Sequence, residues 1–157
     1  MPRRPLMSNE LHLAFPVFQG TVPYRYVLVT DSIGLQDRPY TLNFMGLDDH
    51  DTYHLNVGKT GFVGMGGSFY WRSVLIHELT HVWQAAHAAW APSYIFNSAW
   101  HQAKSGNDAY AYTPGQSWSS YNVEQQAHIV QDWFEDGQQE SSPLFPYIRD
   151  SIRAGRR

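Results

Sequence analysis

The chain has 157 residues, of which 43% are hydrophobic and 16% are charged, a balance that predicts one globular domain and excludes a disordered chain. The formal net charge of −3 excludes a general nucleic-acid-binding surface. No cysteine is present, so disulfides and thiolate metal sites are excluded, and a bound metal must take His, Asp or Glu ligands.

The start of the chain does not predict export or membrane insertion. Arg3 and Arg4 are not followed by an apolar run of signal-peptide length. No later stretch approaches the length of a membrane span. We therefore expect a protein made in the cytoplasm without a signal peptide and with no membrane span. If it leaves the cell, we expect a route other than general secretion.

The first third of the chain predicts short strands. Residues 1–20 show no clear period and are expected to form an irregular arm. Within 21–57, β-branched and aromatic residues favour strands at 24–30, 40–44 and 52–57. The glycines of 58–68 predict a loop.

The rest of the chain predicts helices. A helix is expected over 69–90, because apolar residues recur there at helical spacing: Leu75, Leu79, Val82 and Ala86. Another helix is expected over 93–104. A third helix is expected over 121–136, with Asn122 as N-cap, and a short one after Ser142. Strands followed by helices indicate an α+β fold, in which a small N-terminal β-sheet packs on a helical core within a single domain, 1–157.

The helix over 69–90 carries His77-Glu78-Leu79-Thr80-His81, which matches the H-E-x-x-H motif. Two histidines four residues apart on a helix lie about 40° apart around the axis and roughly 6 Å apart along it, so both rings can bind one zinc ion. Glu78 then lies beside the metal, where it can deprotonate a zinc-activated water. The motif predicts one zinc per chain.

A catalytic zinc needs a third protein ligand. His87 almost completes the metzincin pattern, but Gln84 replaces the required glycine, so the helix should continue and carry His87 away from the site. Glu124, on the next long helix after the motif, is the better candidate and corresponds to the gluzincin arrangement. The alternative for Glu124 is an exposed first-turn carboxylate that interacts with the helix dipole.

Two segments together carry a family resemblance: HELTHVWQ, and later AYAYTPGQSWSSYNVEQQAHIVQDWF. They resemble zinc metallopeptidase domains associated with VgrG and Rhs proteins of type VI secretion systems, over roughly residues 24–136. The resemblance implies a zincin-type core, Glu124 as the third zinc ligand, and an antibacterial effector delivered to the periplasm of a target cell. Implied partners are a protein or peptide substrate, a VgrG or Rhs spike and a cognate immunity protein.

The sequence leaves the transition-state donor and the substrate open. Tyr112, in the Y-x-Y segment before the Glu124 helix, is the favoured hydrogen-bond donor to the oxyanion, and His128, one turn after Glu124, is its rival. Alternatives to peptide hydrolysis are a zinc amidase acting on peptidoglycan, and a catalytically silent, zinc-stabilised binding or processing module. Glu78 argues against the silent module, because a structural zinc site needs no general base.

Overall fold

The computed structural model describes residues 1–44, 52–88 and 110–157. Four strands form one sheet in the order β1-β2-β4-β3: β1 (Arg3–Pro5), β2 (Val27–Thr30), β3 (Tyr40–Phe44) and β4 (Thr52–Asn56). β1 and β3 run antiparallel to their neighbours, whereas β2 and β4 are parallel. In this order β3 is an edge strand of the sheet. The combination of this sheet with helices confirms the predicted α+β fold class.

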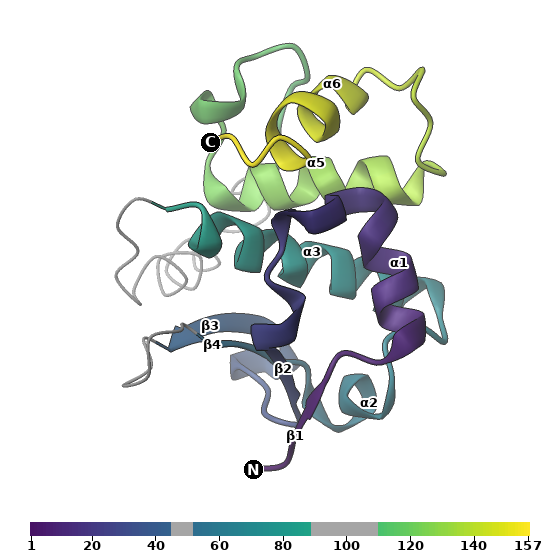
Figure 1. The fold of residues 1–157 in the computed structure, drawn as a ribbon, viewed down its shortest axis with the longest axis vertical. Coiled ribbons are helices and arrows are strands. Elements are labelled where there is room, and N and C mark those ends of the chain that lie inside the picture. The colour runs from purple at the N-terminus through teal and green to yellow at the C-terminus, as the bar shows by residue number, and fades with distance from the viewer. Residues whose placement is uncertain (45–51, 89–109) are drawn as a thin grey trace.

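The motif helix α3 (Phe69–Ala86) lies between the sheet and α5 (Val123–Glu135), as Figure 1 shows. It contacts β3 and β4 on one side and α5 on the other. Because it is covered from both sides, its buried apolar residues surround the axis and do not form a single stripe; they include Leu75, Ile76, Leu79, Val82 and Trp83. The predicted helix is present but ends at Ala86, which is exposed.

The predicted start of α5 is confirmed in detail. The Asn122 side chain accepts a hydrogen bond from the Gln125 backbone at 2.8 Å, and the Gln125 side chain accepts one from the Asn122 backbone at 3.0 Å. This capping box satisfies two backbone donors at the helix start. After α5, the chain continues into α6 (Phe145–Tyr147) and the π-helix η7 (Ile148–Ile152), which agrees with the short helix expected there. Short 3₁₀ turns complete the described elements: η1 (Gln19–Thr21), η2 (Tyr24–Tyr26), η3 (Leu35–Asp37) and η6 (Trp118–Ser120).

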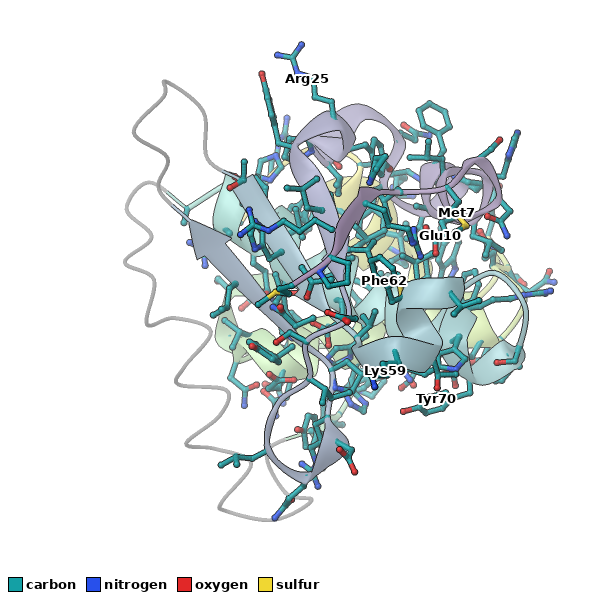
Figure 2. The ribbon with its side chains drawn as sticks, turned by 90° about the horizontal axis from the view of Figure 1, so that it is seen from below. Met7, Glu10, Arg25, Lys59, Phe62 and Tyr70 are labelled. Carbon is teal, nitrogen blue, oxygen red and sulfur yellow. The ribbon has the colours of Figure 1, made fainter. Side chains whose placement is uncertain are left out.

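The prediction of an irregular arm over 1–20 is wrong. Residues of this segment form β1 and the helix α1 (Ser8–Phe18). Glu10 is fully buried, and its carboxylate accepts two hydrogen bonds from Arg4 at 2.8 Å and one from the Met65 backbone at 2.9 Å. Arg4 also donates to the Phe62 carbonyl, and Figure 2 shows Glu10 and Phe62 on the same side of the molecule. A charged pair buried against a distant segment orders this region, and local periodicity does not reveal such a pair.

Two further local predictions need correction. The expected loop 58–68 begins with the helix α2 (Gly58–Val63), which packs so closely that a Cβ atom on Gly61 would lie 2.7 Å from side-chain atoms of Val57 and Trp71. The expected strand 24–30 begins only at Val27, because the Tyr26 backbone N–H donates to the Pro23 carbonyl and closes a turn. The helix expected over 93–104 lies outside the described residues.

None of the helices in the described part of the chain is both long enough and apolar enough to cross a membrane.

Candidate metal centre

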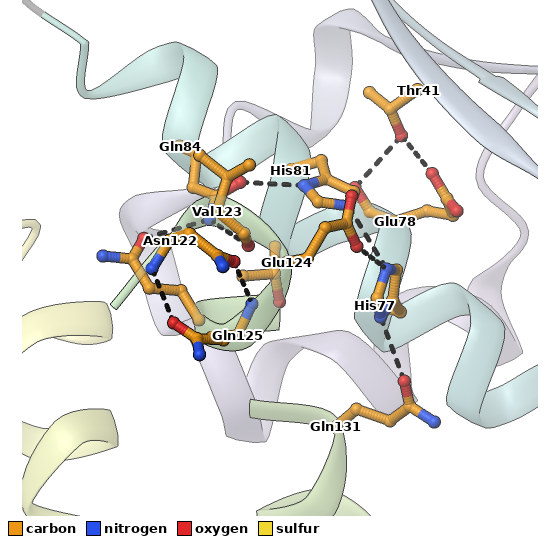
Figure 3. Close-up of polar contacts among 12 residues, drawn as sticks. Thr41, His77, Glu78, His81, Gln84, Asn122, Val123, Glu124, Gln125 and Gln131 are labelled. Atoms are coloured by element: carbon orange, nitrogen blue, oxygen red, sulfur yellow. Dashed lines mark hydrogen bonds and ion pairs between the residues drawn. The ribbon is translucent and has the colours of Figure 1, made fainter. Parts of the chain in front are cut away.

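Three side chains from two helices converge on one point. The Nε2 atoms of His77 and His81 are 3.2 Å apart, and the Glu124 carboxylate oxygens lie 3.3 Å from His77 Nε2 and 3.5 Å from His81 Nε2. Figure 3 shows the two rings and the carboxylate facing one another between α3 and α5. Within residues 1–44, 52–88 and 110–157, this is the one group of three His, Asp or Glu side chains so arranged.

The fold explains why these residues meet. His77 and His81 lie one turn apart on the side of α3 that faces α5, and Glu124 lies in the first turn of α5. Only 4% of Glu124 is exposed. The alternative interpretation of Glu124 as a solvated first-turn carboxylate is therefore wrong. The predicted grouping of His77, His81 and Glu124 is therefore what the structure contains.

The geometry of this cluster fits a zinc ion. Ligand atoms about 2.0–2.1 Å from a tetrahedral centre lie about 3.3 Å from one another. The two nitrogens lie 3.2 Å apart, and each lies 3.3 or 3.5 Å from a different oxygen of the Glu124 carboxylate, so the spacing is close to that value. Imidazole nitrogen and carboxylate oxygen are also ligand types that zinc accepts.

The electrostatics of the cluster also favour a cation. Burial lowers the pKa of His81, but the Glu124 carboxylate more than offsets burial and raises that pKa to about 9. Burial raises the pKa of Glu124, but the charge of His81 and the hydrogen bonds with both histidines hold it below its usual range. Without a metal, a proton on His81 supplies the positive charge that this pocket favours.

The outer nitrogen of each ring contacts a glutamine. Gln131 Oε1 lies 3.0 Å from His77 Nδ1, and Gln84 Oε1 lies 2.8 Å from His81 Nδ1. Sequence reasoning noted Gln84 only as the residue that breaks the metzincin pattern, and it did not single out Gln131. The i, i+3 spacing of His81 and Gln84 was the one local signal that could have identified such a contact.

Glu78 is buried beside the ligands but is not one of them. Its carboxylate accepts a hydrogen bond of 2.6 Å from the Thr41 hydroxyl on β3, and the same hydroxyl lies 3.2 Å from the Glu78 carbonyl (Figure 3). The edge strand of the sheet thus fixes a carboxylate next to His77. No sequence pattern indicates Thr41, which lies 37 residues from Glu78 along the chain.

The two residues considered as transition-state donors occupy different places. His128 packs edge-on against His77, with ring centroids 5.3 Å apart. Tyr112 donates a hydrogen bond of 2.6 Å to Asp132 and lines an open pocket of about 330 Å³ beside the start of α5. Tyr110, two residues earlier, packs on His128 with ring centroids 4.7 Å apart. Burial and the charges of Glu124 and Glu78 raise the pKa of Tyr110, whereas the charge of Arg38 and a hydrogen bond with Arg38 lower it.

His87 lies apart from the cluster, as predicted. It is the C-cap residue of α3, and its ring stacks on Trp83 with centroids 4.7 Å apart. Its Nδ1 atom lies 2.8 Å from the Trp83 carbonyl. Because Gln84 allows the helix to continue, His87 ends the helix and does not approach the metal ligands.

Comparisons with known proteins give one consistent relationship. No protein-family model matches the chain. The chain is 31% identical over 144 residues to the type VI secretion system spike protein VgrG2b of Pseudomonas aeruginosa, an alignment that covers 83% of this chain and 13% of VgrG2b. The solved effector domain of Pseudomonas aeruginosa VgrG2b is similar in structure, with a TM-score of 0.64 and 26% identity over 95% of this chain and 83% of that domain. The chain is therefore similar in sequence and in structure to the effector domain of VgrG2b, and it spans a small part of the whole spike protein.

Proposed function

We propose that the protein is a zinc-dependent metallopeptidase that binds one zinc ion through His77, His81 and Glu124. The observation that carries this proposal is the convergence of two imidazole nitrogens and one buried carboxylate within the reach of a single ion. A hydrogen-bonded carboxylate, Glu78, is near enough to the cluster for its charge to raise the pKa of His81. A bare structural zinc site would not need that carboxylate, which favours an enzyme over a silent binding module.

The zinc ion, when bound, would polarise the scissile carbonyl and make a water molecule acidic enough for a carboxylate to deprotonate. The protein supplies the remaining parts. Glu78 accepts the proton of the attacking water and returns it to the leaving nitrogen, so the same carboxylate acts first as base and then as acid. The Thr41 hydroxyl donates to one Glu78 oxygen, so the second oxygen is the one proposed to take the proton.

We further propose that the protein acts as a type VI secretion effector. Homology to the VgrG2b effector domain supports this role and a link to a VgrG spike. The proposed substrate is a protein or peptide in the periplasm of a target cell, and a cognate immunity protein would protect the producer. Hydrolysis of peptidoglycan amide bonds by the same site is the enzymatic alternative.

The direct test combines zinc content with hydrolysis. The wild type should bind about one zinc per chain and cleave peptide bonds. Glu78→Ala should keep zinc and lose hydrolysis, because only the base is removed. His77→Ala and Glu124→Ala should lose both, whereas His87→Ala, a control histidine on the same helix, should lose neither.

Proteomics of susceptible cells exposed to wild type or Glu78→Ala separates the substrate classes. New protein termini that appear only with the wild type would support the peptidase, and cleaved cell-wall peptides would support the amidase. Full hydrolysis by Glu78→Ala would contradict the mechanism.

A further inference from the structure

We infer that Gln84 and Gln131 are positioning residues that fix both ligand histidines in the Nδ1–H tautomer and thereby set the metal affinity. This inference rests on the zinc site of the proposed function. It concerns two side chains that do not touch the metal position themselves. The argument depends on the direction of each hydrogen bond, which the surrounding acceptors determine.

The direction of the hydrogen bond between His81 and Gln84 follows from a chain of side-chain amides that ends on backbone carbonyls. Gln84 Nε2 donates to the Val123 carbonyl at 2.9 Å and to Gln126 Oε1 at 3.0 Å, which uses both of its hydrogens. Gln126 Nε2 in turn donates to the Trp118 carbonyl at 3.0 Å. A carbonyl can only accept, so neither amide can be reversed without placing two acceptors together. Gln84 Oε1 is thus an acceptor, and His81 Nδ1 must carry the hydrogen.

The direction of the hydrogen bond between His77 and Gln131 follows from the Glu135 carboxylate. Gln131 Nε2 donates to Glu135 Oε1 at 2.8 Å, so Gln131 Oε1 faces His77 Nδ1 as an acceptor. His77 Nδ1 therefore also carries a hydrogen. Gln131 and Glu135 lie one turn apart on α5, the helix that also supplies Glu124.

The consequence is that both Nε2 atoms are kept available for a metal. With each hydrogen held on Nδ1, the two Nε2 atoms point at each other and at Glu124. The partner behind each ring is a neutral amide, although a carboxylate often occupies this place in zinc proteins. Gln84, Gln126 and Gln131 also join α3 to α5, so the ligand orientation depends on how the two helices pack.

The test measures ring tautomers and zinc affinity, neither of which requires peptidase activity. Long-range ¹⁵N–¹H NMR spectra of the zinc-loaded wild type should show a proton on Nδ1 and metal on Nε2 for both rings. Competition with a chelator should show that Gln84→Leu and Gln131→Leu each weaken zinc binding about 10–100-fold, the usual effect of losing such a partner. Gln84 is buried and its variant could misfold, but Gln131 is only partly buried, so its variant keeps the test valid.

Matched variants distinguish positioning from general packing. The double variant Gln131→Glu/Glu135→Gln keeps an acceptor for His77 Nδ1–H and a donor to residue 131, so it should retain the tautomer and bind zinc at least as tightly as the wild type. Gln139→Leu removes an exposed glutamine whose amide bonds only the Gly137 carbonyl, and it should change neither quantity. Wild-type zinc affinity in both leucine variants, or equal losses in Gln131→Glu/Glu135→Gln and Gln131→Leu, would overturn the inference. Zinc binding with these tautomers in a protein that cleaves no peptide would overturn the peptidase and still support the inference.

Discussion

At the scale of single residues, the two tyrosines of the Tyr110-Ala111-Tyr112 segment have different relationships to the metal centre. The Tyr112 hydroxyl is already bonded to Asp132, and burial together with that bond raises the pKa of Tyr112. Tyr110 packs on His128, which in turn packs on His77. The role of oxyanion donor, predicted for Tyr112 from the sequence, would require its bond to Asp132 to break.

Replacing each tyrosine by phenylalanine separates these roles. Removing the hydroxyl of a transition-state donor should lower kcat by a factor of about 10²–10³ and leave the zinc content unchanged. We expect that loss in Tyr110→Phe. Tyr112→Phe should instead keep kcat and lower the free energy of unfolding by about 1.5–3 kcal/mol, the usual value of a hydrogen bond to a charged group. Steady-state kinetics and urea unfolding of both variants measure this, and a large loss of kcat in Tyr112→Phe would return the donor role to Tyr112.

The coupled charges of His81 and Glu124 predict how the metal-free protein responds to pH. The pKa of His81 is raised from 6.5 to about 9, so its contribution to stability is fully present below pH 6.5 and is lost as the pH rises through about 9. The pKa of Glu124 is lowered from 4.5, so its contribution is present above pH 4.5 and is lost under acid conditions. The metal-free protein should therefore be most stable between these two limits.

Thermal unfolding with and without a chelator checks this prediction. The Tm of the metal-free protein should fall between pH 6.5 and pH 9, and zinc should remove most of that fall because a zinc-bound His81 carries no proton on Nε2. Glu124→Gln removes the negative charge that favours the proton, so its metal-free Tm should change less over this range. A metal-free wild-type Tm that rises toward pH 9 would contradict the coupling.

At the scale of secondary-structure elements, the edge strand β3 contributes directly to the site through Thr41. Thr41→Val keeps the shape of the side chain but removes the hydrogen bond to Glu78, so kcat should fall about 10–100-fold with zinc content unchanged. Thr30→Val on β2 is the matched control, because Thr30 is also buried and bonds Asn56 at 2.7 Å. Both variants should be less stable than the wild type, but only Thr41→Val should have a lower kcat. Equal kcat values in the two variants would show that Thr41 does not contribute to the reaction.

The same elements show how far the sequence could predict this structure. The helices α3 and α5 were predictable because their signals are local: an H-E-x-x-H motif with helical spacing, and the cap formed by Asn122 and Gln125. Their convergence at Glu124 followed from ligand chemistry and from the family resemblance. The helix α1 was missed because the buried Arg4–Glu10 pair that orders it depends on contacts with Phe62 and Met65.

The partners of the site residues were the least predictable part. Gln131 and Thr41 lie 54 and 37 residues from the side chains that they bond. No periodicity or motif links residues across such separations, and glutamine and threonine are common on surfaces. These contacts exist only because α3 is packed between β3 and α5.

At the scale of the whole molecule, the candidate metal centre takes its residues from two parts of the fold. His77 and His81 belong to the helix that packs on the sheet, whereas Glu124 belongs to the helix that packs on the C-terminal segment (Figure 1). A bound ion would thus connect α3 to α5 in addition to supplying chemistry. Metal binding and folding are therefore expected to be coupled in this protein.

The proposed place of action is also a property of the whole molecule and can be tested by changing only the compartment. The chain contains no cysteine, so it should fold equally well in reducing and oxidising surroundings, and a difference in toxicity would reflect where the substrate lies. Attached to an export signal and expressed in a bacterial host, the wild type should kill or deform the cells, whereas expression without the signal should be tolerated. Exported Glu78→Ala, with the same fold and zinc site, should be harmless. Growth curves and microscopy of the three strains measure this, and equal toxicity in both compartments would contradict a periplasmic substrate.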